Sequence, residues 1–376
     1  MNQPALTATL AGIALREVQR LPTSAARAVE PFTIDGVQYL AVAQLSEDIP
    51  GTAPGMGAGD SDVDLWVYRW EATGFTEFQR LPVPGGEDAE FFTLDGRHFL
   101  ATASLRSGHG PYDMSPPSVI YEFVNGRFEP FQQIVGTAAK QWHFFGVQRR
   151  YFLALAQGAA GHGAPVDEAA QSILLEWDGE RFVPFQTVES AWGYNWLAFE
   201  VQGRTLLAYA DHIAPSRLLA WNGTAFETLQ VLEGTSGRAF CHFHASCADW
   251  LVFANLLGET WLLRWNGAQF APYQHLSGPG GREFAWLPAR AGADGGHLVQ
   301  VNFIHGSREA PIPELQSVIY RWQGDGLAPV HSFDTSGGTD AAAFTVGGVP
   351  YLAVANSLSG SLHFRTDSRI YQILHT

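Results

Sequence analysis

Histidines and carboxylates at corresponding points along the chain are the residues best suited to chemistry. Five of the 13 histidines lie in connections between apolar segments, namely His109, His162, His212, His305 and His363. A second group of polar side chains comes near the start of a recurring apolar segment: Glu30, Glu90, His143, His242 and Glu283. Imidazoles and carboxylates that converge can hold a divalent metal ion and activate water or a substrate oxygen.

The metal hypothesis names His143, His242 and His305 as ligands. A solvated polar rim would use the same residue types, and no His-Glu-x-x-His pattern or paired-cysteine spacing supports a metal. Alternating aspartates from Asp60 to Asp64 resemble part of a calcium loop. The glycine that such a loop needs is absent, however. A divalent ion, of unspecified identity, therefore stays open as a cofactor.

Aromatic residues and one aspartate complete the predicted binding set. Trp142, Tyr194 and Trp196 accompany the polar residues, and Asp211 is the charged member of an otherwise neutral polar position. The predicted ligand-binding residues are Glu30, Glu90, Trp142, His143, Tyr194, Trp196, Asp211, His242, Glu283 and His305. No nucleophile elbow, phosphate-binding glycine loop or nucleotide fingerprint accompanies them, so the catalytic residues are unknown.

The elements that position these side chains repeat seven times. FTVGGVPYLAVAN begins at Phe344, and FTIDGVQYLAVAQ begins at Phe32. A second segment resembles SVIYRW, which ends at Trp322, and a turn with a central glycine follows it in five copies. A third segment follows the pattern Phe-x-x-Phe-Gln, as in residues 75–79. Self-similarity at a period of 40 to 60 residues indicates a repeat array.

Each repeat has four apolar runs of strand length separated by tight turns such as Asp35-Gly36. Four antiparallel strands repeated seven times predict an all-β fold, a seven-bladed β-propeller. The third-segment pattern is missing after the last repeat and is found instead at residues 15–19. We therefore expect the N-terminal segment to supply the outer strand of the last blade, which closes the ring and removes exposed edges.

The repeated segments resemble the epilepsy-associated repeat, also called the EAR, epitempin or EPTP repeat. The resemblance covers about residues 14–376 and rests on Phe-x-x-x-Gly followed by YLAVAN, Ser-x-Ile-Tyr-x-Trp and Asn-Gly-x-x-Phe-x-x-x-Gln. It implies a seven-bladed propeller. Known animal members are secreted or cell-surface proteins whose propellers bind other proteins. This chain departs from them in having no leucine-rich repeats and no membrane segment.

Positions that recur in every blade are best explained by packing. We expect two aromatic positions to pack between blades. One is the position of Phe32, which Trp286 occupies in blade six, and the other is the tryptophan that ends the second segment. A polar residue such as Gln44 ends the YLAVAN segment, and a Ser or Thr such as Ser118 begins the next segment. Because buried polar groups need partners, we expect a hydrogen bond between these two positions, which we call the latch. The connections between these two segments are long in blades one, two, three and six, and long loops on a rigid scaffold carry binding sites.

Composition favours one domain over residues 1–376, with residues 1–13 as a flexible N-terminal arm. The net charge of −15 leaves no basic footprint for nucleic acid. No run of 18 apolar residues predicts a membrane helix. The first residues lack the basic start of a signal peptide, and Cys241 and Cys247 are expected to be reduced. A cytoplasmic location is therefore expected.

The sequence leaves two functions open. The leading hypothesis is a binding propeller that takes a small molecule or a protein on the face with the long loops. The alternative is a small-molecule enzyme, a metal-assisted lyase, cyclase or hydrolase, with its site at the mouth of the axial channel. The fold supports both functions, so it does not decide between them.

Overall fold

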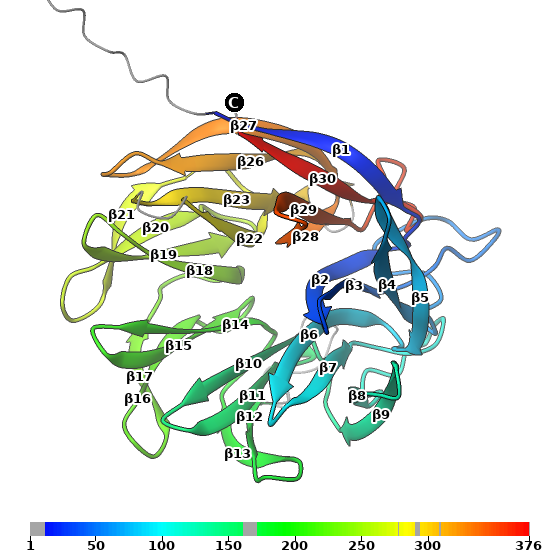
Figure 1. The fold of residues 1–376 in the computed structure, drawn as a ribbon, viewed down its shortest axis with the longest axis horizontal. Helices are drawn as coiled ribbons and strands as arrows, with labels where there is room; N and C mark the ends of the chain where they lie inside the picture. The colour runs from blue at the N-terminus through cyan, green and yellow to red at the C-terminus, as the bar shows by residue number, and fades with distance from the viewer. Residues whose placement is uncertain (1–11, 161–170, 277, 290–293, 308–309, 376) are drawn as a thin grey trace, which may run out of the picture.

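Seven four-stranded antiparallel sheets surround a central axis (Figure 1). The computed structural model describes residues 12–160, 171–276, 278–289, 294–307 and 310–375. Inner strands of neighbouring blades contact one another around the whole ring. The predicted all-β, seven-bladed propeller is confirmed in the described residues, where no helix long and apolar enough to cross a membrane occurs.

Each blade runs outward from an inner strand at the axis. Blade 1 contains β2 (Ala26–Ile34), β3 (Val37–Gln44), β4 (Asp64–Glu71) and β5 (Gly74–Pro82). Blade 2 contains β6 (Gly86–Leu94), β7 (Arg97–Ser104), β8 (Ser118–Val124) and β9 (Arg127–Ile134). Blade 3 contains β10 (Gln141–Val147), β11 (Arg150–Ala156), β12 (Ser172–Trp177) and β13 (Phe182–Val188). Blade 4 contains β14 (Gly193–Val201), β15 (Arg204–Asp211), β16 (Arg217–Trp221) and β17 (Phe226–Val231).

The remaining blades continue the same order. Blade 5 contains β18 (Gly237–Ala245), β19 (Ala248–Asn255), β20 (Trp261–Trp265) and β21 (Phe270–His275). Blade 6 contains β22 (Gly281–Pro288), β23 (Gly296–Asn302), β26 (Glu314–Trp322) and β27 (Leu327–Ser336), with the small pair β24 (His305–Gly306) and β25 (Pro311–Ile312) in its long connection. Blade 7 contains β28 (Gly338–Val346), β29 (Val349–Asn356), β30 (Ser368–His375) and β1 (Ile13–Leu21).

The ring closes as the sequence predicts. β1 pairs antiparallel with β30, from Ile13 opposite His375 to Leu21 opposite Ser368. Ile13 and Leu21 are buried, so β1 contributes to the core as well as to the ladder. The predicted N-terminal arm, residues 1–13, lies outside the described residues except for its last two positions.

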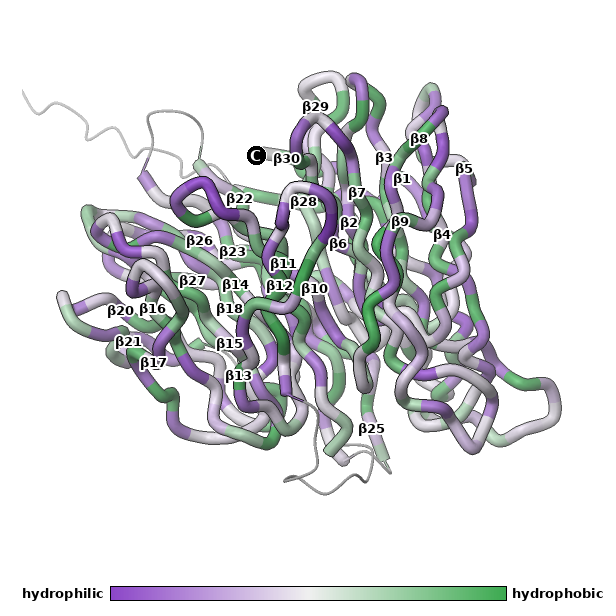
Figure 2. The backbone as a smooth tube through the Cα atoms, turned by 90° about the horizontal axis from the view of Figure 1, so that it is seen from below, coloured by the Kyte–Doolittle hydropathy of each residue, from purple (hydrophilic) through white to green (hydrophobic). Residues whose placement is uncertain are grey.

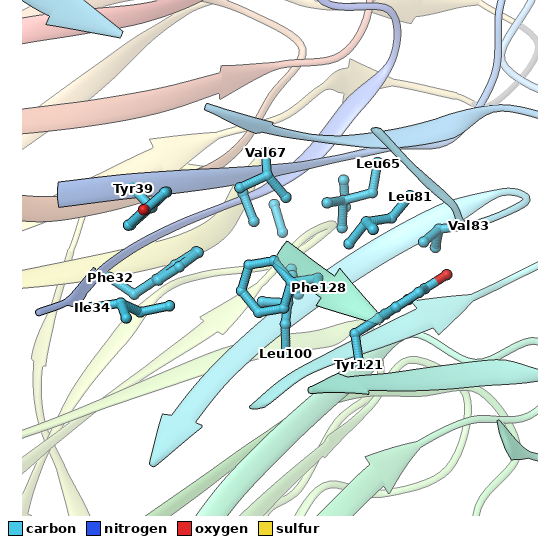
Figure 3. Close-up of a cluster of buried hydrophobic side chains, with 14 residues drawn as sticks. Phe32, Ile34, Tyr39, Leu65, Val67, Leu81, Val83, Leu100, Tyr121 and Phe128 are labelled. Carbon is cyan, nitrogen blue, oxygen red and sulfur yellow. The ribbon is translucent and has the colours of Figure 1, made fainter. Parts of the chain in front are cut away.

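Aromatic stacking joins the inner strands of neighbouring blades. Phe32 of blade 1 stacks on Phe91 of blade 2 with ring centroids 4.3 Å apart. Blades 1 and 2 share one apolar core, which contains Phe32, Tyr39, Leu100 and Phe128 (Figure 3). Each blade thus buries an apolar face only against its neighbours, as repeat architectures require.

One core position differs from the sequence alignment. The alignment matches Trp286 with Phe32, but in the structure Leu287 pairs with His297 as Phe32 pairs with Tyr39. Trp286 lies one residue earlier and stacks on Phe243 of blade 5 at 4.1 Å. The longer connection between β22 and β23 obscures this register in the sequence.

A glutamine clamp joins the outer strands. Gln79 Nε2 donates to the Phe128 carbonyl at 2.8 Å, and the Phe128 N–H donates to Gln79 Oε1 at 2.9 Å. The same pair of bonds recurs at Gln19, Gln132, Gln186, Gln230 and Gln274. Blade 6 has His331 at this position, which lacks the adjacent carbonyl and amino groups of an amide.

The predicted latch is present, with a specific division of roles. The Ser118, Ser172, Ser216 and Ser317 hydroxyls each accept the backbone N–H of the polar residue that ends the second strand, at 3.0 to 3.1 Å. The polar side chain bonds elsewhere: Gln44 Oε1 accepts from the Ser24 N–H at 2.8 Å and its amide donates to the Asp64 carbonyl at 3.0 Å. Gln157 and Asn356 accept the Thr137 and Ser336 N–H groups in the same way, both at 2.9 Å, so in blades 1, 3 and 7 this side chain connects the blade to the segment that enters it.

The second-to-third connections lie on the same face as the segments between blades. The Leu45 N–H donates to the Ala25 carbonyl at 3.0 Å, and the Ala138 N–H donates to the Met114 carbonyl at 2.7 Å. In the side view, β25 lies at the lower end of the ring, on this face (Figure 2). We call it the loop face. Cys241 is buried and Cys247 is exposed, and both are free thiols.

Candidate functional site

Six of the seven inner strands begin with a register irregularity that turns one side chain toward the axis, and Lys140 directly precedes the seventh, β10, whose register is regular. In β2, for example, the register with β3 shifts between Ala26 and Ala28, which leaves Arg27 in a bulge. Bulges redirect side chains in this way. The corresponding residues are Arg27, Glu87, Lys140, Tyr194, Arg238, Arg282 and Thr339, which we call the mouth ring.

Six of the mouth-ring residues line one chamber of about 430 Å³, and Thr339 lies deeper. The chamber wall toward the loop face comes from the residues that directly follow the second strands: Leu45, Leu105, His212, Leu256 and Phe303. We call these five residues the collar. Met56 and Ile304, from the long connections of blades 1 and 6, extend the apolar wall. The chamber thus has a polar floor and a largely apolar collar.

The floor of the chamber is strongly cationic. Arg27 Nε lies 3.6 Å and Lys140 Nζ 3.7 Å from Glu87 Oε1, while Arg282 Nη2 lies 3.7 Å from Glu87 Oε2. Three cations therefore share one buried carboxylate. Arg238 is also buried, and no salt bridge connects it to a carboxylate among the described residues.

Tyr194 lies among these cations. The Arg238 guanidinium lies over its ring, 3.7 Å from the centroid, with Arg282 at 5.1 Å and Lys140 Nζ at 5.3 Å. Burial raises the pKa of the Tyr194 phenol, but the opposing effect of Arg238, Lys140 and Arg282 leaves that pKa below its ordinary value. Burial also lowers the pKa of Arg238 to about 10.

Asp211 supports one side of the chamber from behind. Its fully buried carboxylate accepts the backbone N–H groups of Ala191 at 2.9 Å, Trp192 at 3.1 Å and Ala214 at 2.8 Å. These bonds fix the two segments that carry Trp192 and His212, whose rings meet edge to face at 4.9 Å. Burial, followed by the charge of Arg238, lowers the pKa of His212 to about 3, which keeps the ring neutral.

Four predicted polar residues, Glu30, Glu90, His143 and Glu283, lie deeper, in a second cavity of about 230 Å³ along the axis. Glu30 accepts the Phe91 N–H at 3.2 Å, and Glu90 accepts the Phe144 N–H at 2.8 Å. His143 Nε2 accepts the Ala198 N–H at 3.0 Å. Inner strands have an unpaired edge toward the axis, and these side chains satisfy N–H groups on that edge in the next blade.

The same cavity holds carboxyl groups with altered acidity. Burial raises the pKa of Glu90 to about 7, that of Glu283 to about 8 and that of Asp340 to about 6. The pKa of Glu30 also lies well above its ordinary value, because of burial first and the charge of Glu90 second. These carboxyl groups hold protons more tightly than exposed ones do.

The three histidines predicted as metal ligands have separate surroundings. His143 faces the next blade, His242 stacks on Phe199 at 4.4 Å and lies 3.3 Å from Asp249, and His305 is exposed in β24. Among the described residues, no group of three or more His, Cys, Asp or Glu side chains is arranged to hold a metal ion. The structure therefore does not bring the predicted ligands together.

Two predicted binding residues belong to the core. Trp142 and Trp196 are 0% and 1% exposed. The Trp142 indole N–H donates to the Thr102 carbonyl at 3.0 Å, and Trp196 packs on Tyr209 at 4.3 Å. Both indoles thus pack between blades, and Trp196 also borders the second cavity. His162, another histidine noted in the sequence, lies outside the described residues.

The four cations of the mouth ring were not predicted. Arg27, Lys140, Arg238 and Arg282 lie far apart in the sequence, but each occupies the same place in its repeat. An alignment of the seven inner strands, read column by column, would have shown four basic residues at one position of an acidic chain. Of the predicted residues, Tyr194 lines the chamber and Asp211 supports it.

Comparison with known proteins agrees with the fold. The EPTP domain model matches residues 15–71, 74–123, 181–222 and 326–373, more than half of the chain. The human thrombospondin-type laminin G domain and EAR repeat-containing protein is 28% identical over 149 residues, 39% of this chain and 21% of that protein. The mouse protein of that name is 28% identical over 253 residues, 51% of this chain and 36% of that protein. The match thus spans between a fifth and two fifths of each relative, and the chain belongs to the EPTP domain family.

Proposed function

We propose that this protein is a binding scaffold and that its ligand enters the chamber at the loop-face end of the axial channel. The observation that supports this proposal is the chamber itself, a hollow of about 430 Å³ lined by charged, aromatic and apolar side chains from several blades. Ligand sites commonly have this size and combine an apolar wall with a few polar groups. Membership of a family of propellers agrees with a scaffold role.

The way the chamber is built also supports ligand binding. The long connections of blades 1 and 6 contribute Met56, Phe303 and Ile304 to its wall. Rigid blades hold these loops in place, which is the arrangement by which repeat scaffolds present binding residues. Tyr194 at the floor and Trp192 at the wall offer aromatic faces to a ligand.

A blocking substitution tests the chamber. Ser307 lies on its wall and is exposed, so Ser307→Trp should fill the entrance without disturbing a blade. A matched control is Glu180→Trp, in the exposed turn between β12 and β13 on the opposite face. We expect compounds that raise the unfolding temperature of the wild type and of Glu180→Trp to lose that effect in Ser307→Trp.

Two results would count against the proposal. If every compound raises the unfolding temperature of Ser307→Trp and Glu180→Trp equally, the binding site lies outside the chamber. Conversion of a bound compound into product, abolished by Ser307→Trp, would replace the scaffold by the enzyme alternative. Binding without conversion, sensitive only to Ser307→Trp, is the expected result.

A further inference from the structure

We infer that the ligand of this chamber is an organic anion, with its acidic group among Arg27, Lys140, Arg238 and Arg282 and an apolar body against the collar. This inference rests on the proposed function, because it takes the chamber as the binding site. The acidic group is a carboxylate or a phosphate monoester, two groups that arginine recognises through the same paired N–H donors.

The charge of the mouth ring supports an anion. Four cations face one carboxylate, Glu87, and the distances of 3.6 to 3.7 Å are longer than direct hydrogen bonds. Lys140, Arg238 and Arg282 are buried. A buried charge without a matching counter-charge is unfavourable, and an anion placed among the four cations removes this excess.

The deeper carboxyl groups do not supply the missing negative charge. Glu30 and Glu90 accept backbone N–H groups of the next blade, and Asp340 does the same for the Val29 N–H at 2.8 Å. Among the described residues, none of these three forms a salt bridge with a mouth-ring cation. Asp88 likewise accepts the Trp142 N–H at 2.7 Å. The charge of Arg282 partly offsets the burial that raises the pKa of Glu283 and Asp340, but no salt bridge joins either carboxyl group to a mouth-ring cation among the described residues. No direct ion pair from the deeper cavity therefore matches the cations above it.

Two polar groups of chamber-lining residues are not satisfied within the described residues. Arg27 Nε is buried and has no hydrogen-bond acceptor there, and His212 Nδ1 is buried and has no hydrogen-bond partner there. The hydrogen bond that Arg238 forms runs to its neighbour, the Gly237 carbonyl, at 3.4 Å. Arg106, which also borders the chamber, is instead committed to loop oxygens such as the Ala58 carbonyl at 2.8 Å.

The collar indicates that the anion carries an apolar part. Leu45, Leu105, Leu256 and Phe303 surround the space above the cations, and Leu257, 60% exposed, lies at the entrance. An inorganic ion would occupy the floor and leave this apolar surface in contact with water. A ligand with an acidic head and an apolar body matches both parts of the chamber.

The test compares octyl compounds that differ only in the head group. Octanoate and octyl phosphate are the anionic probes, octyltrimethylammonium is the cationic probe and octyl glucoside is the neutral one, all used below their micelle concentrations. Isothermal titration calorimetry should show at least one anion binding about tenfold or more tightly than the other two probes. The preferred anion identifies the head group as carboxylate or phosphate.

Substitutions then assign the binding to the mouth ring. Arg238→Met and Lys140→Met should each weaken anion binding about tenfold to a hundredfold, the effect of losing a charged hydrogen-bond partner. Arg80→Met is the control, because Arg80 is exposed on β5 and paired with Glu77 at 2.9 Å. Without ligand, Arg238→Met should unfold at the same or a higher temperature than the wild type, since it removes an unmatched buried charge.

The outcomes separate this inference from the proposed function. Octyl glucoside binding as tightly as the anions, and blocked by Ser307→Trp, would overturn the anion but keep the chamber. Unchanged anion affinity in both Met variants would also overturn the inference. A third outcome is that no octyl probe binds, whereas a poly-glutamate peptide binds to the wild type and not to Arg238→Met. The ligand would then be an acidic protein segment and not a small anion. If no probe binds, and Ser307→Trp and Glu180→Trp are stabilised equally by every compound, both the anion and the chamber as binding site are ruled out.

Discussion

The outer rim and the mouth ring are equivalent parts of the same repeat, but they vary in opposite ways. At the rim, one residue type recurs in six blades as a glutamine that clamps the next outer strand. At the mouth, seven corresponding positions hold Arg, Glu, Lys, Tyr, Arg, Arg and Thr. A contact needed at every blade interface favours one residue, whereas a single asymmetric ligand requires different residues from different blades.

The two regions also differ in how their polar groups are satisfied. Each rim clamp pairs one amide with one N–H and one carbonyl, so both backbone groups of the neighbouring strand have a partner. At the mouth, Arg27, Lys140 and Arg282 share Glu87 at long range. Incomplete satisfaction lowers stability and is tolerated where a ligand completes the interactions.

Removal of β1 is the rim change with the largest expected effect on stability. Deletion of residues 1–20 exposes the edge of β30 and uncovers the core around Ile13. We expect the free energy of unfolding to fall by about 5 kcal/mol or more, the loss of a packed strand. Denaturant unfolding measures this loss, and the exposed edge should promote association. A truncated monomer of wild-type stability would mean that closure of blade 7 contributes little.

The sequence predicted this closure because Leu15 to Gln19 copies the outer-strand pattern of Phe75 to Gln79. Repetition supplies many examples of each contact, so the fold could be predicted almost completely. The site occurs once and has no such redundancy. Glu30 and Glu90 looked like ligands because the sequence does not show the unpaired N–H groups of the next blade that they satisfy.

The cationic floor was missed for a related reason. Arg238 and Arg282 become neighbours only because β18 and β22 are adjacent inner strands. Their side chains converge because of bulges, which the sequence pattern does not mark. The sequence analysis selected histidines because imidazole serves both catalysis and metal binding, and it did not compare basic residues across the repeats.

The pH dependence of stability distinguishes the channel from the rim. Glu283 and Glu90 have pKa values of about 8 and about 7 in the folded protein, because of burial. Both pKa values lie above those of the unfolded chain, so the folded state binds more protons and stability falls as the pH rises through these values. Between pH 7 and 8.5, where unfolded histidines are mostly neutral, the loss should be about 1 to 2 kcal/mol.

Denaturant unfolding across this pH range checks the prediction. Glu283→Gln should flatten the decline, since an amide does not titrate. Glu77→Gln serves as the control, because Glu77 is exposed on β5 at the rim. A slope that is the same in the wild type and in Glu283→Gln would contradict the assignment of the decline to the channel.

Removal of one clamp is a smaller test of the rim. Gln79→Leu keeps an apolar stem between blades 1 and 2 but leaves the Phe128 N–H and carbonyl without the amide. We expect a loss of about 1 to 2 kcal/mol in the free energy of unfolding, the cost of two hydrogen bonds at a partly buried site. Anion binding at the chamber should not change. A change in affinity that matches the change in stability would show that rim and mouth are coupled.

Completion of the clamp ring with a seventh glutamine should change the free energy of unfolding least, and it should raise this free energy, which Gln79→Leu lowers. His331 in β27 occupies the clamp position of blade 6, and Leu15 in β1 occupies the place that Phe75 and Phe128 have in the other outer strands. His331→Gln would offer an amide to the Leu15 N–H and carbonyl across the seam between blades 6 and 7. A gain of about 0.5 to 1 kcal/mol is expected, since exposed backbone groups exchange water for a protein partner. The gain should vanish when residues 1–20 are deleted, because that deletion removes Leu15. Stabilisation that persists in the truncated protein would come from the histidine replacement itself and not from a seventh clamp.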